Sequence, residues 1–141
     1  MIREYEDKDL EELLEAWYSA SKVAHPFLSE EFLEQERKNI ESVNLPNAGT
    51  WVYELNGAVV GFIALIGNEV GAIFLDPEYH GKGIGRALMD HARSIRDTLE
   101  LDVFKDNTIG RNFYKKYGFI EEYEHLHKET GFMQLRLKLT Y

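Results

Sequence analysis

Apolar residues recur every third or fourth position in several stretches of the chain, as they do in helices with one buried face. In the first stretch Leu10, Leu13 and Trp17 follow this spacing, and Asp7 or Asp9 suits the capping position before them. The pattern predicts helices over residues 9–21, 29–42, 84–95 and 107–117, of which the second is the most charged.

Shorter runs, in which apolar residues alternate with polar ones or dominate, predict strands. They cover residues 1–6, 50–55, 58–66, 69–75, 99–104, 119–126 and 132–139. Asn56-Gly57, a pair that favours a tight hairpin turn, joins the second of these strands to the third. The run from Val70 to Leu75 is nearly all apolar, which predicts a strand covered on both faces. The order of elements predicts a mixed α/β sheet, and we expect residues 1–141 to form one domain.

The composition narrows the class of protein. Hydrophobic residues make up 44% of the chain, which argues for a packed core and against disorder. There is no cysteine, so disulfides, a thiol nucleophile and thiolate metal sites are excluded. The net charge of −9 makes nucleic acid a poor partner, because phosphate binding depends on clustered Lys and Arg. No apolar run is long enough for a membrane span or a signal peptide, and we expect a cytoplasmic protein.

Residues 76–89, DPEYHGKGIGRALM, carry three glycines directly before a predicted helix: Gly81, Gly83 and Gly85. Such glycines can form a plain turn, or can let backbone N–H groups approach an anion at the helix N-terminus. Lys82 and Arg86 add positive charge there. Arg86 also stands where a dinucleotide-binding loop needs its last glycine, and the spacing does not fit a Walker loop. The motif by itself leaves both the turn and the phosphate site open.

A second polar pattern follows the strand at 99–104. Asn107 and Tyr114 are about two helical turns apart, so their side chains project from nearly the same face of the predicted helix. An amide and a phenol in this arrangement can hold and protonate a ligand along the helix start. Asn107 equally suits an N-cap, and Tyr114 equally suits a core position beside Phe113.

The glycine motif and the later stretch N…FYKKYGF together resemble the GNAT superfamily of acetyl-CoA-dependent N-acetyltransferases. The segments AW…SA…AHPFLSEEF, WVYE and GFIALIGNEV are similar to its short bacterial YjaB/YiaC-type members. The resemblance implies a mixed, mostly antiparallel sheet of about six or seven strands, splayed between strands 4 and 5 and flanked by about four helices. His80 departs from the pattern, which usually has Gln or Arg there, and we expect weakened pyrophosphate binding. Gly110, where alanine is more usual, is expected to be a small change on a helix face.

The resemblance further implies that acetyl-CoA is the co-substrate and lies between the strands at 69–75 and 99–104. Its pantetheine would pair with main chain, its pyrophosphate would meet the glycine loop, and the following helix would supply further contacts. The main chain that pairs with pantetheine would be that of Ile73, Phe74 and Leu75. The loop residues that meet the pyrophosphate would be Gly81, Lys82, Gly83, Ile84, Gly85 and Arg86. The further contacts from the helix would be Asn107 with Arg111 or Lys115.

The implied chemistry needs a neutral amine to attack the thioester and an acid for the departing thiolate. Tyr114 is the expected acid, because a phenol is neutral at pH 7 and its O–H can meet the sulfur. Glu69, at the start of a strand, and His25, between the first two helices, are rival candidates for the base. A catalytically degenerate acyl-CoA-binding sensor is the alternative function.

The acceptor is expected to be a primary amine, either of a small molecule or of a protein. Phe27, Trp17 and Trp51 either line its pocket or belong to the core. His125 and His127 have no further ligand spaced near them, so we expect an acceptor-site role and no metal. The sequence does not choose between a monomer and a homodimer.

Overall fold

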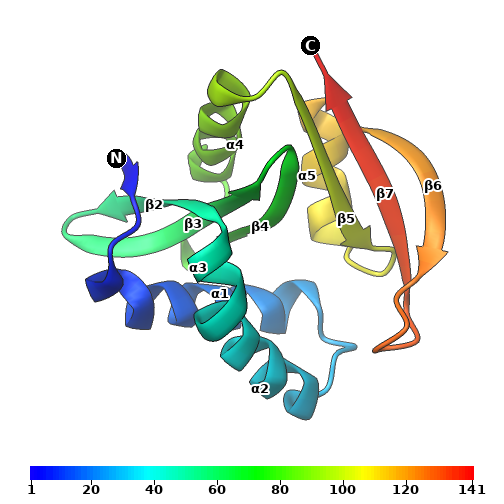
Figure 1. The fold of residues 1–141 in the computed structure, drawn as a ribbon, viewed down its shortest axis with the longest axis horizontal. Helices are drawn as coiled ribbons and strands as arrows, with labels where there is room; N and C mark the ends of the chain where they lie inside the picture. Colours follow the sequence, from blue (N-terminus) through cyan, green and yellow to red (C-terminus); the bar gives the residue numbers. More distant parts are fainter.

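Seven strands form one sheet in the order β1-β2-β3-β4-β5-β7-β6, described over residues 1–141 by a computed structural model (Figure 1). Neighbouring strands are antiparallel except β4 and β5, which are parallel. The strands are β1 (Ile2–Glu4), β2 (Gly49–Leu55), β3 (Ala58–Ile66), β4 (Glu69–Leu75), β5 (Thr98–Phe104), β6 (Ile120–Leu126) and β7 (Met133–Thr140). The predicted mixed, mostly antiparallel sheet is confirmed.

The main helices flank this sheet, as predicted, and short helical turns lie between the elements. The main helices are α1 (Leu10–Ala24), α2 (Glu30–Asn39), α4 (Ile84–Ile95) and α5 (Thr108–Tyr117). The short turns are η1 (Asp7–Asp9), the π-helical η2 (Ile40–Asn44), α3 (Leu45–Asn47) and η3 (Pro77–Tyr79). None of the helices has the length and apolar character that a membrane crossing requires.

The core has two layers, one on each face of the sheet. Leu88 and Met89 of α4 pack in one cluster with Ile63 of β3, and α5 adds partly buried aromatic side chains to it. On the other face Leu13 of α1 packs in a second cluster with Phe62 of β3. In Figure 1, α1 and α2 accordingly lie below the sheet and α4 above it. The central strand β3 is therefore covered on both faces, and seven of its nine residues are buried.

β4 is covered on both faces, as its apolar run predicts, since its side chains belong to both core clusters, but it is less buried than β3. Only Val70 of this strand is buried, and Gly71 is exposed. β4 pairs with β5 only at Glu69, opposite Glu100, and then follows β3 alone. Gly71 is an extra residue in the β3–β4 register, a bulge of the kind that bends a strand. The edge of β4 that faces β5 is therefore open, which confirms the splay.

Two helix ends differ from the predicted ones. α1 continues to Ala24 and stops at His25, because the residue before Pro26 is disfavoured in a helix. The second helix leaves α-helical geometry at Asn39, and a π-helical turn carries Ile40 into the core. That turn lies beside the functional cavities described below, where such turns are frequent.

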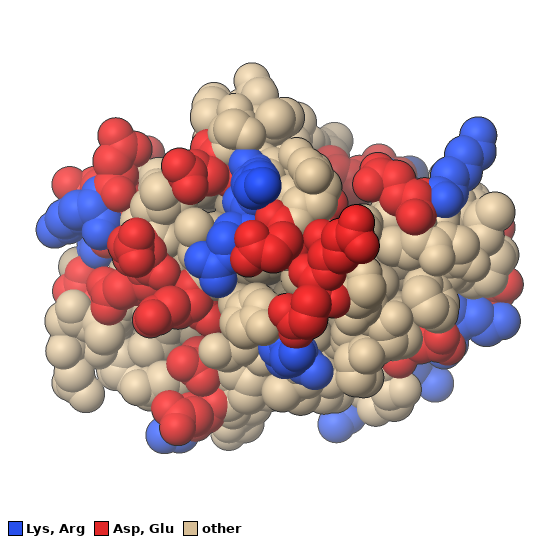
Figure 2. Space-filling model, turned by 90° about the horizontal axis from the view of Figure 1, so that it is seen from below, with Lys and Arg blue, Asp and Glu red and all other residues tan.

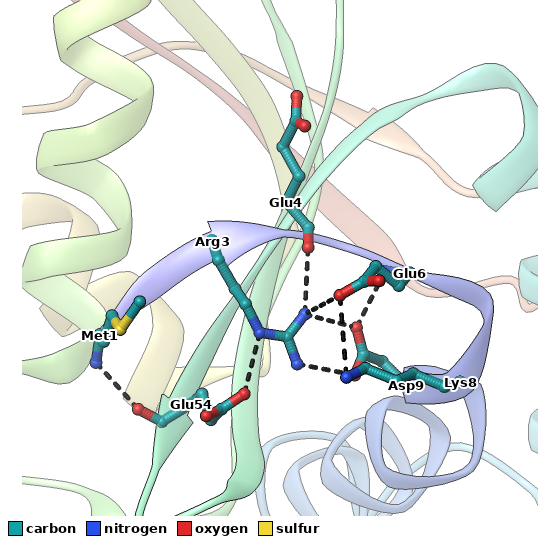
Figure 3. A network of polar contacts seen from close by, with 7 residues as sticks. All are labelled: Met1, Arg3, Glu4, Glu6, Lys8, Asp9 and Glu54. Atoms are coloured by element: carbon teal, nitrogen blue, oxygen red, sulfur yellow. Dashed lines mark hydrogen bonds and ion pairs between the residues drawn. The ribbon is translucent and has the colours of Figure 1, made fainter.

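An ion-pair network holds the N-terminal segment to the sheet (Figure 3). Both Nη atoms of Arg3 donate to the carboxylate of Asp9 at 2.8 Å, and Nε donates to Glu54 of β2 at 2.9 Å. Asp9 is only 2% exposed and also accepts from the backbone N–H of Glu6 at 2.9 Å. The hydrogen bonds from Arg3 hold the pKa of Asp9 below its usual range.

We expect Asp9→Asn to lower the free energy of unfolding by roughly 2 kcal/mol at pH 7, because a charged acceptor of several hydrogen bonds is lost. Since the pKa of Asp9 is lowered in the folded state, its contribution is present above about pH 4 and is lost as the pH falls further. Urea denaturation of both chains at pH 7 and pH 3.5 measures this difference. Lys8→Ala is the matched control, since Lys8 is exposed and makes only a long ion pair of 3.9 Å with Glu6. An equal loss of stability in Lys8→Ala would contradict the role assigned to Asp9.

Candidate active site

The glycine loop leads from β4 into α4 and presents the start of that helix. Gly81 and Gly83 have φ angles of 79° and 81°, in the left-handed region that glycine adopts without strain. Gly83 is the N-cap residue, so no side chain satisfies the first N–H groups of α4. The first turn contains Arg86 and no acidic residue. These N–H groups, the helix dipole and Arg86 together suit a bound anion.

A cleft of about 370 Å³ lies beside this loop. Of the residues predicted to bind the cofactor, it is lined by Ile73, Phe74, Leu75, Gly81, Gly83, Ile84, Gly85, Arg86 and Asn107. Ala20 and Ala24 of α1 and Gly110 of α5 also line it, and their small side chains leave the space open.

Three predicted phosphate contacts lie outside the cleft. Lys82 is exposed, and its ammonium lies 5.6 Å from the centre of the Tyr79 ring. Arg111 and Lys115 line a separate hollow between α5 and β6. There the Arg111 guanidinium donates to the carbonyl oxygen of Lys105 and pairs with Glu121. None of these three side chains therefore lines the cleft.

His80 has a contact that the sequence did not predict. It lines the cleft, and its Nε2–H donates to the carbonyl oxygen of Leu75 at 3.2 Å. The hydrogen bond ties the glycine loop back to the last residue of β4.

A second cavity, of about 240 Å³, shares Ile73, Phe74, Asn107 and Tyr114 with the cleft. It extends to residues of α1, α2, β5 and the β6–β7 turn, among them Trp17, Glu36, Asp102, Phe104 and His127. The two cavities therefore meet at Asn107 and Tyr114, the pair predicted to bind a ligand.

An aromatic cluster borders the second cavity. The ring centres of Phe27 lie 5.6 Å from Phe104 and 4.9 Å from Phe132, and Phe104 lies 5.3 Å from His127. Phe27 itself lines neither cavity, and its ring packing matches the core role among its two predicted ones. Trp51 also lines neither cavity, and its ring centre lies 4.9 Å from that of His91 of α4.

Tyr114 is packed between Phe113 and Phe119, whose ring centres lie 5.5 and 5.6 Å away. Burial raises the pKa of its hydroxyl above the usual range. The hydroxyl makes no hydrogen bond within the chain, so a protonated donor stands at the junction of the two cavities.

His25 lies in the loop between α1 and α2, and its Nε2 is 3.2 Å from Nδ2 of Asn107. The rings of Phe27, Phe74 and Phe104 meet it edge-on, with centres 5.2 to 6.4 Å away. Burial lowers the pKa of His25 to about 4, so the imidazole is neutral at pH 7.

Glu69 lies outside both cavities. Its carboxylate accepts from Nη1 and Nη2 of Arg136, on β7, at 2.8 and 2.6 Å. Arg136 also lies 3.4 Å from Asp102, which in turn bonds His125 at 2.9 Å. Glu69 is therefore not brought together with Tyr114, and the ion pair links β4 to β7 where β4 leaves β5.

Sequence reasoning missed Glu36 as a residue of the second cavity. Burial raises the pKa of its carboxyl, and the nearby charge of Glu129 adds to the effect. A signal was present, because Glu36 falls between Leu33 and Ile40 on the stripe of α2 that turns toward the core. Asp102 and Phe104 had no such signal, since a strand face does not reveal a neighbouring opening.

The surface around α1 and α2 is acidic. Figure 2 views the molecule from below Figure 1, the side on which these helices lie, and acidic side chains predominate over basic ones there. The exposed carboxylates of the two helices include Glu11, Glu15, Glu30, Glu31 and Glu34. Such a surface attracts cationic partners.

Known proteins share this sequence pattern. A family model of the acetyltransferase (GNAT) domain matches residues 46–121. The peptidyl-lysine N-acetyltransferase YiaC of Escherichia coli (strain K12) is 32% identical over 120 residues, 84% of this chain and 82% of its own length. The peptidyl-lysine N-acetyltransferase YjaB of the same strain is 36% identical over 119 residues, 84% of this chain and 80% of its own length.

Solved structures share the fold. The solution structure of apo YjaB from Escherichia coli matches with a TM-score of 0.87 and 32% identity over 98% of this chain and 95% of that chain. The crystal structure of PaiA N-acetyltransferase from Thermoplasma acidophilum in complex with coenzyme A matches with a TM-score of 0.84 and 25% identity, over 100% and 98%. A splayed sheet with a cleft at a helix N-terminus is thus the fold of an N-acyltransferase. The chain belongs to the GNAT acetyltransferase family.

We expect Glu69→Gln to lower stability by roughly 1–2 kcal/mol, because the ion pair with Arg136 is weakened. We expect kcat/KM to fall less than about threefold, because Glu69 lines neither cavity. Thermal denaturation and steady-state kinetics of both chains measure the two effects. Glu100→Gln is the control, since Glu100 lies 3.9 Å from the same guanidinium. A fall in kcat of about a hundredfold, the size expected on losing a general base, would assign that role to Glu69 after all.

Proposed function

We propose that this protein transfers the acetyl group of acetyl-CoA to the side-chain amine of a lysine in a peptide or protein. The observation that carries the proposal is the meeting of the two cavities at Asn107 and Tyr114. The relatives YiaC and YjaB are named as peptidyl-lysine N-acetyltransferases, which supports lysine as the acceptor. The acidic surface around α1 and α2 supports a basic polypeptide as the partner.

The residues of the cleft fit acetyl-CoA. The uncapped N–H groups at the start of α4, with Arg86, suit its pyrophosphate. The open edge of β4 after Glu69 offers main-chain groups to the amides of pantetheine, as a sheet edge does to an added strand. Acetyl-CoA supplies a thioester whose carbonyl carbon is attacked by the amine, and the CoA thiol is released.

The chain acts on the amine mainly through the environment of the second cavity. A lysine amine is mostly protonated at pH 7, and deprotonating it in water costs about 4–5 kcal/mol. The aromatic side chains around Phe104 favour the neutral amine, because desolvation lowers the pKa of an ammonium group. Glu69 lies outside the cavity and Nε2 of His25 already meets Asn107. Neither of them therefore takes the amine proton in our proposal; water carries it away, and Glu36 and Asp102 are the carboxylates that line the cavity.

Tyr114 stabilises the departing sulfur. Its hydroxyl is free of partners within the chain, and its raised pKa keeps it protonated. A thiol has a pKa of about 8.5, so complete transfer of the tyrosine proton to the thiolate is uphill. Hydrogen-bond donation to the developing negative charge is therefore the larger part of its role.

We expect Tyr114→Phe to lower kcat at least about tenfold while the affinity for acetyl-CoA stays within about twofold. The phenyl ring keeps the packing against Phe113 and Phe119, and only the donor is lost. Steady-state kinetics and calorimetric titration with CoA measure the two quantities. Tyr117→Phe, a matched change on the same helix at a residue that lines neither cavity, should keep kcat. An unchanged kcat in Tyr114→Phe would remove Tyr114 from the mechanism.

The function itself is tested by thiol release from acetyl-CoA with lysine peptides, free lysine and small amines as acceptors. We expect release with peptides, and mass spectrometry should place the acetyl group on the lysine side chain. Binding of CoA without release for any amine would instead identify the acyl-CoA sensor. No shift of the melting temperature on adding acetyl-CoA would contradict both functions. Three other expectations stay predictions: that the protein is cytoplasmic, that it forms one domain, and that it is a monomer or a homodimer.

A further inference from the structure

The α1–α2 loop and the start of α5 meet at a single polar contact. His25 and Asn107 are 82 residues apart in the chain, and Nε2 of the first lies 3.2 Å from Nδ2 of the second. Asn107 is buried, with 7% of its surface exposed, and it lines both cavities. What holds its side chain therefore affects both binding sites.

The hydrogen bonds of Asn107 fix which end of its amide is the donor. Oδ1 accepts from the backbone N–H of Gly110 at 2.9 Å, as the N-cap of α5. Nδ2 is then the amino end, and one of its hydrogens is donated to Nε2 of His25. The second N–H has no partner within the chain. It remains available to an acceptor in the cleft, such as a pantetheine carbonyl.

Nε2 of His25 must act as an acceptor in this contact, so the proton of the neutral ring is on Nδ1. The groups that face the ring are Phe27, Phe74, Phe104 and the amide of Asn107, and no charged side chain shifts its titration. If the ring were protonated, the N–H on Nε2 of His25 would face an N–H of Asn107, and the hydrogen bond between them would be lost. The aromatic surroundings thus preserve the acceptor that Asn107 needs.

Gly110 limits Asn107 from the other side. A Cβ at position 110 would lie 2.5 Å from Nδ2 and 3.0 Å from Cγ of Asn107. The amide could not move aside without losing its bonds to His25 and to the Gly110 N–H. Alanine at this position would therefore make the Asn107 amide shift, a larger effect than the expected small change on a helix face.

We propose that His25 is a positioning residue: it accepts a hydrogen bond from Asn107 and so keeps the second N–H of that amide ready for the pantetheine of acetyl-CoA. The inference rests on the proposed use of the cleft for acetyl-CoA. It gives His25 a role in cofactor binding in place of the role of general base. It also links the α1–α2 loop, which carries Phe27, to the cleft proposed for the cofactor.

The test uses His25→Leu, which keeps an apolar side chain of similar bulk without an acceptor, and His25→Gln, whose Oε1 can replace Nε2. We expect His25→Leu to weaken CoA binding roughly fivefold, the effect of one lost hydrogen bond, with kcat at saturating acetyl-CoA within about twofold. His25→Gln should restore most of the affinity. The pH dependence of kcat should be the same in all three chains, because His25 carries no proton in the reaction.

Gly110→Ala tests the same amide from α5. We expect it to weaken CoA binding as well, and the double variant His25→Leu/Gly110→Ala should be no weaker than the worse single variant, because both act on one side chain. Side-chain amide signals of Asn107 in ¹H–¹⁵N spectra should shift in His25→Leu and stay near their original positions in His25→Gln. If His25→Leu does not fold, CoA binding by Gly110→Ala and the Asn107 signals in His25→Gln still test the inference.

Unchanged CoA affinity in His25→Leu, or additive losses in the double variant, would overturn the inference and leave the proposed function intact. A large fall in kcat in both His25 variants, with loss of the acidic limb of the pH profile, would make His25 the base instead. Failure of the wild-type chain to bind CoA would overturn the proposed function and this inference together.

Discussion

The rest of the structure depends on the parting of β4 from β5. The two parallel strands share one paired position, and beyond it β4 has a neighbour only on the β3 side. The bulge at Gly71 bends β4 there, and the ion pair between Glu69 and Arg136 holds its first residue to β7. An unpaired strand edge inside a sheet is unusual, because its N–H and C=O groups need partners. Here residues of that edge line both cavities, so a bound molecule can supply those partners.

Two helix N-termini lie at this opening, and they are capped in different ways. α4 begins at Gly83, which leaves its first N–H groups uncapped and suited to an anion. α5 begins at Asn107, whose side chain caps the helix and also meets His25. The second arrangement places a buried polar side chain between the two cavities, and the missing Cβ at position 110 leaves its amide room to lie there. The two cavities, proposed for the cofactor and the acceptor, are thus joined by one amide.

The sequence predicted most of the fold and part of the placement of the candidate site residues. Strands, main helices, the hairpin at Asn56-Gly57 and the glycine loop depend on local residue patterns, and the structure has them where those patterns lie. The apolar run of β4 correctly predicted helices on both of its faces, but it could not reveal that the edge toward β5 opens, because the apolar pattern does not say whether a strand's neighbour is another strand or a gap. Arg111 lies on the helix predicted for it, α5, but it lines the hollow toward β6 and not the cleft.

By itself, then, the sequence determined the order of elements, the glycine loop before α4 and the spacing of Asn107 and Tyr114 on α5. These features depend on residues a few positions apart, which follow the periods of helices and strands. Only the tertiary structure decided that Glu69 pairs with Arg136, 67 residues away, and that His25 meets Asn107, 82 residues away. Contacts of this kind depend on how the two halves of the sheet separate, and no local pattern of side chains carries that information.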